Sequence, residues 1–202
     1  MAIKLLILGL LMERDRHPYE IRQTMKERNW HVAFKVRDGS LYYAVDQLRQ
    51  DGLIEAAEII PSQGDNRPDK RIYRITEKGN EAFLDLLYAQ FGQTAVPFHP
   101  LFPGLPFVRR GEMEKVAELM EKQLADCEAR IAKLSAVLEM KHAYLPRGAI
   151  HMIQGIIRFS ETELDWLNDM LDDVRSGKMA EPGYDPRGAE GCSGAADTNE
   201  VE

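Results

Sequence analysis

Hydroxyl, amide and phenol side chains recur over residues 39–50 at a spacing that places them on one side of a helix. Ser40, Tyr43 and Gln47 are three and four residues apart, and Tyr42 lies beside them. Such groups hydrogen-bond to base edges and to phosphate oxygens in the grooves of DNA. A helix face in contact with water alone would carry the same residue types, so the flanking sequence must decide between the two interpretations.

The opposite side of this segment is apolar and predicts how the polar side is held. Four residues recur at the helical period, namely Leu41, Ala44, Val45 and Leu48. Asp38 stands where an N-cap residue belongs, and Gly52 is a stop signal before the apolar Leu53. We therefore expect a helix from Asp38 to Gln50 that buries its apolar stripe and exposes the polar side.

Basic residues flank this helix in the sequence. Lys35 and Arg37 precede it, and Arg67, Lys70 and Arg71 follow it between two strand-like runs. Cations in such places can neutralise phosphates or enter a minor groove. An ordinary charged turn is the alternative for the second group. We favour a contact with DNA because this turn comes directly after a polar-faced helix.

The net charge of −7 and the isoelectric point near 5.4 argue against attraction of the whole protein to nucleic acid. The charge is unevenly distributed, however. Residues 1–89 carry 14 Lys and Arg against 14 Asp and Glu, so the whole negative excess lies in residues 90–202. A local basic patch in the first part of the chain is compatible with this distribution.

The order of elements predicted for residues 1–90 is that of a winged helix-turn-helix. Helices are expected from Ile3 to Met12, from Tyr19 to about Arg28 with Tyr19 buried, and from Asp38 to Gln50. The residues from Trp30 to Lys35 are expected to be a connector. Strands over 53–60 and 70–75 would form a hairpin, and Thr76 would cap a last helix. In this fold the third helix enters the major groove and the hairpin is the wing.

Residues 92–107 contain four prolines interleaved with apolar side chains, which predicts an ordered connector packed on a neighbour. Two long helices are expected after it, over about 111–141 and 147–174. The second has an apolar seam at alternating spacings of three and four residues, which indicates helix–helix packing. From this seam we expect the dimer contact to comprise Ile150, Ile153, Ile157, Leu164, Leu167 and Leu171.

The predicted fold class is therefore mainly α with a small β-hairpin: a winged helix-turn-helix domain followed by a helical dimerisation domain. We assign the winged helix to residues 1–90, a proline-rich connector to 91–110 and the dimerisation domain to 111–175. Residues 176–202 are rich in Gly, Ser, Asp and Glu and carry a net charge of −4, which predicts a disordered acidic tail.

Several motifs in order resemble the PadR family of bacterial transcriptional regulators. They are residues 7–11 (Ile-Leu-Gly-Leu-Leu), 18–21 (Pro-Tyr-Glu-Ile), 39–48 beginning Gly-Ser-Leu-Tyr, 52–54 (Gly-Leu-Ile) and 71–79 (Arg-Ile-Tyr-Arg-Ile-Thr-Glu-Lys-Gly). The match covers residues 3–90 closely, and residues 100–174 look like the longer C-terminal region of one subgroup. The resemblance implies dimerisation through the C-terminal helices and repression of nearby genes, relieved by a small molecule such as a phenolic acid.

The sequence offers little support for catalysis. No nucleophile motif or phosphate-binding glycine loop occurs, the histidines lack metal-ligand spacing, and no cofactor is expected. Cys127 lies on an apolar seam, where a core role is favoured over redox sensing. The aromatic residues Trp30, Phe98, Phe102, Phe107, Phe159 and Trp166 would either line a ligand pocket or pack as a core. The cysteine content and the lack of a membrane-length apolar run predict a cytoplasmic protein.

The sequence thus predicts a homodimeric, sequence-specific DNA-binding repressor with a pseudo-palindromic operator and a small aromatic effector. The DNA contacts would come from Lys35, Arg37, Ser40, Tyr42, Tyr43, Gln47, Arg67, Lys70 and Arg71. The alternative is a winged-helix module or adaptor for protein contacts that does not recognise a DNA sequence.

Overall fold

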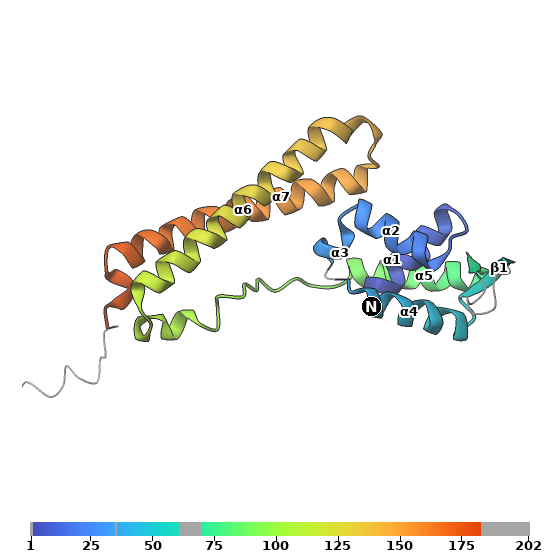
Figure 1. Cartoon of the computed structure of the whole chain (residues 1–202), viewed down its shortest axis with the longest axis horizontal. Coiled ribbons are helices and arrows are strands. Elements are labelled where there is room, and N and C mark those ends of the chain that lie inside the picture. The colour runs from blue at the N-terminus through green and yellow to red at the C-terminus, as the bar shows by residue number, and fades with distance from the viewer. Residues whose placement is uncertain (1, 35, 61–69, 183–202) are drawn as a thin grey trace, which may run out of the picture. The chain divides into compact units, whose positions relative to one another are not determined.

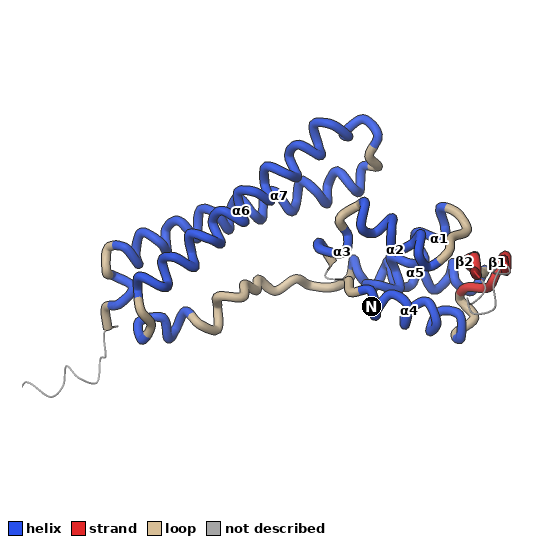
Figure 2. The backbone as a smooth tube through the Cα atoms, in the orientation of Figure 1, coloured by secondary structure: helices blue, strands red, loops and turns tan. Residues whose placement is uncertain are grey.

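The computed structural model describes residues 2–34, 36–60 and 70–182 of the chain. The chain divides into two compact units, Met1–Val96 and Pro97–Glu202 (Figure 1). Helices make up most of both units, and the two strands belong to the first (Figure 2). Over the described ranges, no helix has the length and apolar character needed to cross a membrane.

The first unit has the order of elements that a winged helix-turn-helix requires. Its elements are α1 (Ala2–Glu13), α2 (Pro18–Glu27), α3 (Trp30–Ala33), α4 (Asp38–Gln50), β1 (Ile54–Ile60), β2 (Lys70–Ile75) and α5 (Glu77–Phe91). The strands are antiparallel and pair from Ile54 with Ile75 to Ile60 with Lys70, with an irregularity between Ala56 and Glu58. The fold class is mainly α with a small β-hairpin, as predicted from the sequence.

The prediction of a plain connector over residues 30–35 was wrong, because the short helix α3 lies there. Asn29 adopts a left-handed conformation with φ of 55° after the end of α2, and the chain then begins a new turn. The guanidinium of Arg28 lies 5.0 Å from the centre of the Trp30 ring, and the ring of Phe34 meets the same side chain edge-on. Aromatic packing therefore holds a helical turn that has no periodic signal of its own.

The core of the first unit is a single cluster to which α1, α2, α4 and both strands contribute. Its buried members are Ile7, Leu8, Leu10, Leu11, Ile21, Met25, Leu41, Ala44, Val45, Leu48, Ile54 and Tyr73. The expected burial of Tyr19 was wrong, since this side chain is 54% exposed. In α2 the buried stripe runs through Pro18, Ile21 and Met25, and Tyr19 projects to one side of it.

The start of α5 is fixed to the turn that follows α4. The hydroxyl of Thr76 accepts a hydrogen bond from the amide of Gly79 at 3.0 Å, as expected of a cap, and donates one to the carbonyl of Gly52 at 2.9 Å. The ammonium of Lys78 donates to the carbonyl of Asp51 at 2.8 Å. A Cβ atom at Gly79 would overlap the carbonyl oxygen of Leu53, so this backbone contact requires glycine.

The second unit is a helical hairpin with one short helix at its turn and two at its open end. It contains the 3-10 helix η1 (Leu105–Arg110), α6 (Met113–Lys141), η2 (His142–Tyr144), α7 (Arg147–Arg175) and η3 (Lys178–Ala180). A cluster of buried residues joins the two long helices near this end, comprising Met120, Leu167, Met170, Leu171 and Val174. Leu101 and Leu105 of the proline-rich segment pack against it.

A polar network crosses the middle of the helical hairpin. The buried Cys127 thiol donates to the carbonyl of Ser160 at 3.1 Å, and the Arg130 guanidinium donates to the Ser160 hydroxyl at 2.8 Å. Arg130 also binds Glu163, whose other carboxylate oxygen lies 3.1 Å from Nε2 of His99. Burial raises the pKa of the Cys127 thiol, so the structure supports a core role for this residue.

Candidate nucleic-acid interface

The outer face of α4 carries most of the polar residues that the sequence nominates for DNA contact. Ser40, Tyr42 and Tyr43 are exposed, and Tyr43 projects most with 68% of its surface accessible. Gln47 is partly buried, and its amide nitrogen donates to the side-chain oxygen of Gln50 at 3.3 Å. Because the opposite side of α4 is anchored in the core, this helix presents hydroxyl, phenol and amide groups on a fixed support.

The start of α4 differs from the sequence-based expectation. The N-cap position belongs to Arg37, no side chain caps the helix, and Asp38 is its first residue. Asp38 instead accepts a hydrogen bond from Arg22 of α2 at 2.6 Å. The guanidinium lowers the pKa of the Asp38 carboxyl below its ordinary value of 3.8. The pair ties α2 to α4 and offsets a negative charge at the end of the helix where a phosphate would approach.

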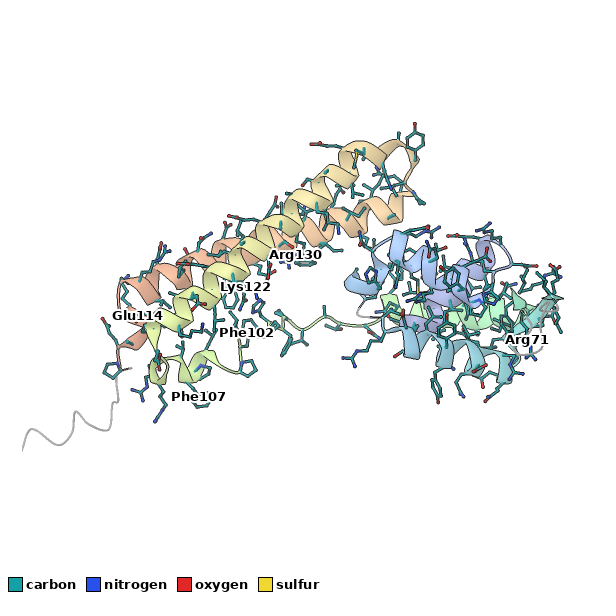
Figure 3. The ribbon with its side chains drawn as sticks, viewed as in Figure 1. Arg71, Phe102, Phe107, Glu114, Lys122 and Arg130 are labelled. Carbon is teal, nitrogen blue, oxygen red and sulfur yellow. The ribbon has the colours of Figure 1, made fainter. Side chains whose placement is uncertain are left out.

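The hairpin places one of the predicted wing cations at the surface. Arg71 is exposed on β2 (Figure 3). Lys35 and Arg67 lie outside the described residues, and Lys70 begins β2 with its side chain outside them. The structure adds Arg49, which the sequence reasoning missed. Arg49 of α4 and Arg71 line the same surface hollow, so the helix and the hairpin present cations on one side. Arg49 follows Tyr42 by seven residues, which is about two helical turns, and this spacing was the signal available in the sequence.

The seam of α7 is largely buried against α6 within one chain. Among the six residues assigned to a dimer contact, Ile150, Ile153, Leu167 and Leu171 are buried, whereas Ile157 and Leu164 are partly exposed. Beside the seam, Phe159 is 79% exposed. The four buried residues stabilise the helical hairpin itself. A contact with another chain would have to use the exposed and partly exposed positions.

Two aromatic rings of the second unit meet that of Trp166, although Phe102 is also 42% exposed. The Trp166 ring meets those of His99 and Phe102 edge-on, with centroid separations of 4.9 and 5.6 Å. Phe107 and Phe159 are exposed. Figure 3 labels Phe102 and Phe107. Within the part of the chain that the structure describes, no three His, Cys, Asp or Glu side chains are grouped so as to hold a metal ion.

These features define a winged helix-turn-helix protein with a helical C-terminal unit. The model of the family described as "Transcriptional regulator PadR-like family" matches residues 7–85. The chain is also 33% identical over 88 residues to uncharacterized protein X of Lysinibacillus sphaericus, which is 44% of this chain and 76% of that protein. The chain belongs to the PadR-like family of transcriptional regulators. It is therefore a regulator and not an enzyme.

Solved structures share the fold across both units. Bacillus subtilis PadR in complex with operator DNA is 18% identical, with a TM-score of 0.66 over 86% of this chain and 99% of that chain. The same protein in complex with p-coumaric acid, also 18% identical, gives a TM-score of 0.67 over 87% and 99%. The virulence activator AphA of Vibrio cholerae is 15% identical, with a TM-score of 0.65 over 86% and 98%.

Proposed function

We propose that this protein is a dimeric repressor that binds a specific, pseudo-palindromic DNA operator and is released by a small aromatic effector. The observation that carries the proposal is the arrangement of α4. Its apolar stripe is buried in the core, while Ser40, Tyr42 and Tyr43 lie at the surface on a rigid helix. A helix held in this way can enter a major groove and present its polar side to base edges.

Each set of candidate residues has a separate role in this proposal. Tyr43 and Gln47 would contact base edges, and Ser40 and Tyr42 would contact bases or phosphates. Lys35 and Arg37 would hold phosphates near the start of α4. Arg67, Lys70 and Arg71 would form the wing contacts, and Arg49 lines the same surface hollow as Arg71. Phosphate contacts fix the position of the protein, whereas base contacts select the sequence.

Dimerisation would set the form of the operator. Two α4 helices related by a two-fold axis would enter successive major grooves about 10 bp apart, which requires a pseudo-palindromic site. We propose that residues 111–175 provide the contact through α7, with Phe159, Ile157 and Leu164 at its surface. Exposed apolar residues along one long helix support this role.

Repression and the effector are supported by relatives alone. Bacillus subtilis PadR has been crystallised with operator DNA and with p-coumaric acid, which suggests a phenolic ligand for this chain as well. The Vibrio cholerae relative is named an activator, so the direction of regulation needs its own test. If the protein represses, it should lower the expression of a reporter gene placed behind its preferred operator. Addition of a phenolic acid should restore that expression.

The decisive experiment is selection of the preferred DNA from a random pool, followed by titration at several salt concentrations. Replacing Arg67, Lys70 and Arg71 by alanine should weaken binding to all sequences about equally. It should also flatten the salt dependence by about 0.9 per lost phosphate contact in each protomer. The matched control replaces Lys122, Lys133 and Lys141, three exposed lysines of α6, and should leave the slope unchanged.

Two outcomes would count against this function. An unchanged salt slope in the Arg67, Lys70 and Arg71 variant would remove the wing from the DNA contact. Recovery of no preferred sequence from the pool would favour the alternative role, a winged-helix module for protein contacts.

A further inference from the structure

The loop between α1 and α2 extends the hairpin by one bridging residue. The amide of Arg16 donates to the carbonyl of Tyr73 at 3.0 Å, and the amide of Tyr73 donates back to the carbonyl of Arg16 at 2.9 Å. Tyr73 belongs to β2 and to the buried core. One side of the hairpin therefore meets the helix-turn-helix through a pair of backbone hydrogen bonds near its base.

The side chain of Arg16 anchors this loop on the helices. Although it is charged, Arg16 is only 5% exposed. Its guanidinium donates to the carbonyl of Leu10 at 3.1 Å, to the hydroxyl of Thr24 at 3.1 Å and to the carboxylate of Glu13 at 2.6 Å. These bonds satisfy the buried charge and join the loop to both α1 and α2. Arg16 is thus part of the folded framework, and its removal would threaten the fold.

Asp15, the neighbouring residue, makes a second link to the hairpin on the outside of the protein. Its carboxylate accepts from Nε and one terminal nitrogen of Arg74, with the shortest distance being 2.7 Å. Both side chains are partly exposed, and 59 residues separate them in the sequence. Asp15 raises the pKa of Arg74 through this bond. The fork geometry commits the Arg74 guanidinium to Asp15.

We infer that the Asp15–Arg74 pair is a clasp that holds the hairpin at the angle needed for its contact with DNA. Asp15 is then a positioning residue for DNA binding, and this role rests on the function proposed above. The clasp fixes the base of the hairpin to a loop that the helices already anchor, and it can be removed without disturbing the core.

The geometry of the hairpin explains why a weak surface pair can matter. Arg74 lies four steps along the strand from Lys70, which is about 13 Å at the usual rise. A rotation of about 10° at the base would move the far end of that strand by about 2 Å. A displacement of that size exceeds the range of donor–acceptor distances that a hydrogen bond tolerates. A small change at the clasp is therefore enlarged at the end of the hairpin that would meet the DNA.

The test uses the full-length protein with Asp15→Asn, Arg74→Ala and the double variant. On the selected operator, hydroxyl-radical footprinting reports the contact of the hairpin with the flanks, and methylation of guanine N7 reports α4 in the major groove. We expect Asp15→Asn to reduce flank protection and operator affinity by about two- to fivefold, the range for an exposed pair. Methylation protection at saturating protein should not change.

Two further readouts distinguish positioning from loss of fold. The double variant should be no weaker than either single variant, because the two residues act through one bond. Without DNA, amide hydrogen exchange of β1 and β2 should accelerate about two- to fivefold while the melting temperature stays the same. The control is Glu121→Gln, which breaks a somewhat more exposed pair with Arg175 in the second unit at 2.8 Å and should alter none of these readouts.

Failure of the clasp and failure of the proposed function would look different. Unchanged exchange and unchanged flank protection in Asp15→Asn would overturn the clasp while DNA binding stands. If Asp15→Asn speeds up exchange but the wild-type protein protects no DNA, the proposed function is overturned. The role of Asp15 in DNA binding is then overturned as well. Additive losses in the double variant would also overturn the clasp.

Discussion

The winged-helix unit and the helical unit bury their apolar residues in different ways. In the first unit, three helices and two strands converge on a closed cluster, and Ile7, Leu8 and Leu10 of α1 have no accessible surface. In the second unit, the buried residues follow one seam between α6 and α7. Large apolar side chains such as Phe159 and Met140 remain exposed there.

This difference indicates which unit has an apolar surface that a partner chain would cover. The first unit gathers its buried residues in one closed cluster and leaves the polar face of α4 free to bind, although Tyr88 and Phe91 of α5 remain exposed. A two-helix layer covers one side of each helix only, and exposed apolar residues beside a seam are typical of a surface that meets a partner. The proposed division of labour, with DNA bound by one unit and a second copy by the other, follows from this contrast.

The largest expected effect comes from breaking the seam. Leu167 is fully buried between α6 and α7, and Leu167→Ala should destabilise the helical unit by about 2–5 kcal/mol through lost packing and a cavity. Urea unfolding would be followed by fluorescence in variants that keep one tryptophan each, Trp166 in this unit or Trp30 in the other. Leu119→Ala, at a half-exposed position of α6, should change stability by about 0.5 kcal/mol or less. A matching shift of the Trp30 transition would mean that the units unfold together.

The next effect concerns the partner surface. Phe159→Asp should leave the hairpin folded, because the side chain is exposed. It should weaken the dimer by about 2 kcal/mol or more for each Phe159 that the interface buries. Sedimentation equilibrium measures the dissociation constant. Tyr144→Asp, at an exposed position in η2, is the control and should not alter it. An unaffected dimer would move the proposed contact to the other side of the seam, where Ile157→Asp tests it.

A smaller effect is expected on the recognition helix. Gln47→Ala should cost about 1–3 kcal/mol on the selected operator and little on random DNA if the amide contacts a base edge. Gln90→Ala is a close control, because Gln90 of α5 bonds to Gln93 with the same spacing and the same 3.3 Å distance as Gln47 to Gln50. Equal losses on operator and random DNA would assign Gln47 to the phosphate backbone.

The smallest effect is a difference in acid sensitivity between the units. Arg28 lowers the pKa of Glu13 below its ordinary value of 4.5, and Arg22 lowers that of Asp38 below 3.8. Both carboxyls therefore stabilise the winged-helix unit above those values, and this contribution is lost as the pH falls through the lower folded pKa values. The loss is small because both groups are accessible to water.

Urea titrations between pH 5 and about pH 2 would measure this loss separately in each unit with the single-tryptophan variants. Glu13→Gln should flatten the pH dependence of the Trp30 transition. A pH dependence that is unchanged by this substitution would show that Glu13 is not its source.

Local periodicity was sufficient to predict the helix that carries the candidate site. Leu41, Ala44, Val45 and Leu48 are all buried as expected, since a stripe of this kind has one way to face a core. The cap at Thr76 was also predictable, because it depends on residues within one turn.

Features that depend on distant segments could not be predicted in this way. Asp38 has the side chain of an N-cap, but Arg22, sixteen residues earlier, binds it instead. Nothing in the local pattern around Asp15 indicates a bond to Arg74. The seam of α7 was recognised, yet periodicity alone does not say whether α6 or another chain covers Leu167. In each case the partner is set by the tertiary fold.

The hydrogen bonds between the start of α5 and the turn after α4 have a mechanical consequence. With Thr76 and Lys78 bonded to that turn, and Gly79 in backbone contact with Leu53, the start of α5 is tied to the end of α4. A displacement of the start of α5 would therefore pull on the end of α4. In a dimer, a regulatory signal arriving along α5 would alter the separation and tilt of the two α4 helices, and neither helix would have to unfold for the operator to be released.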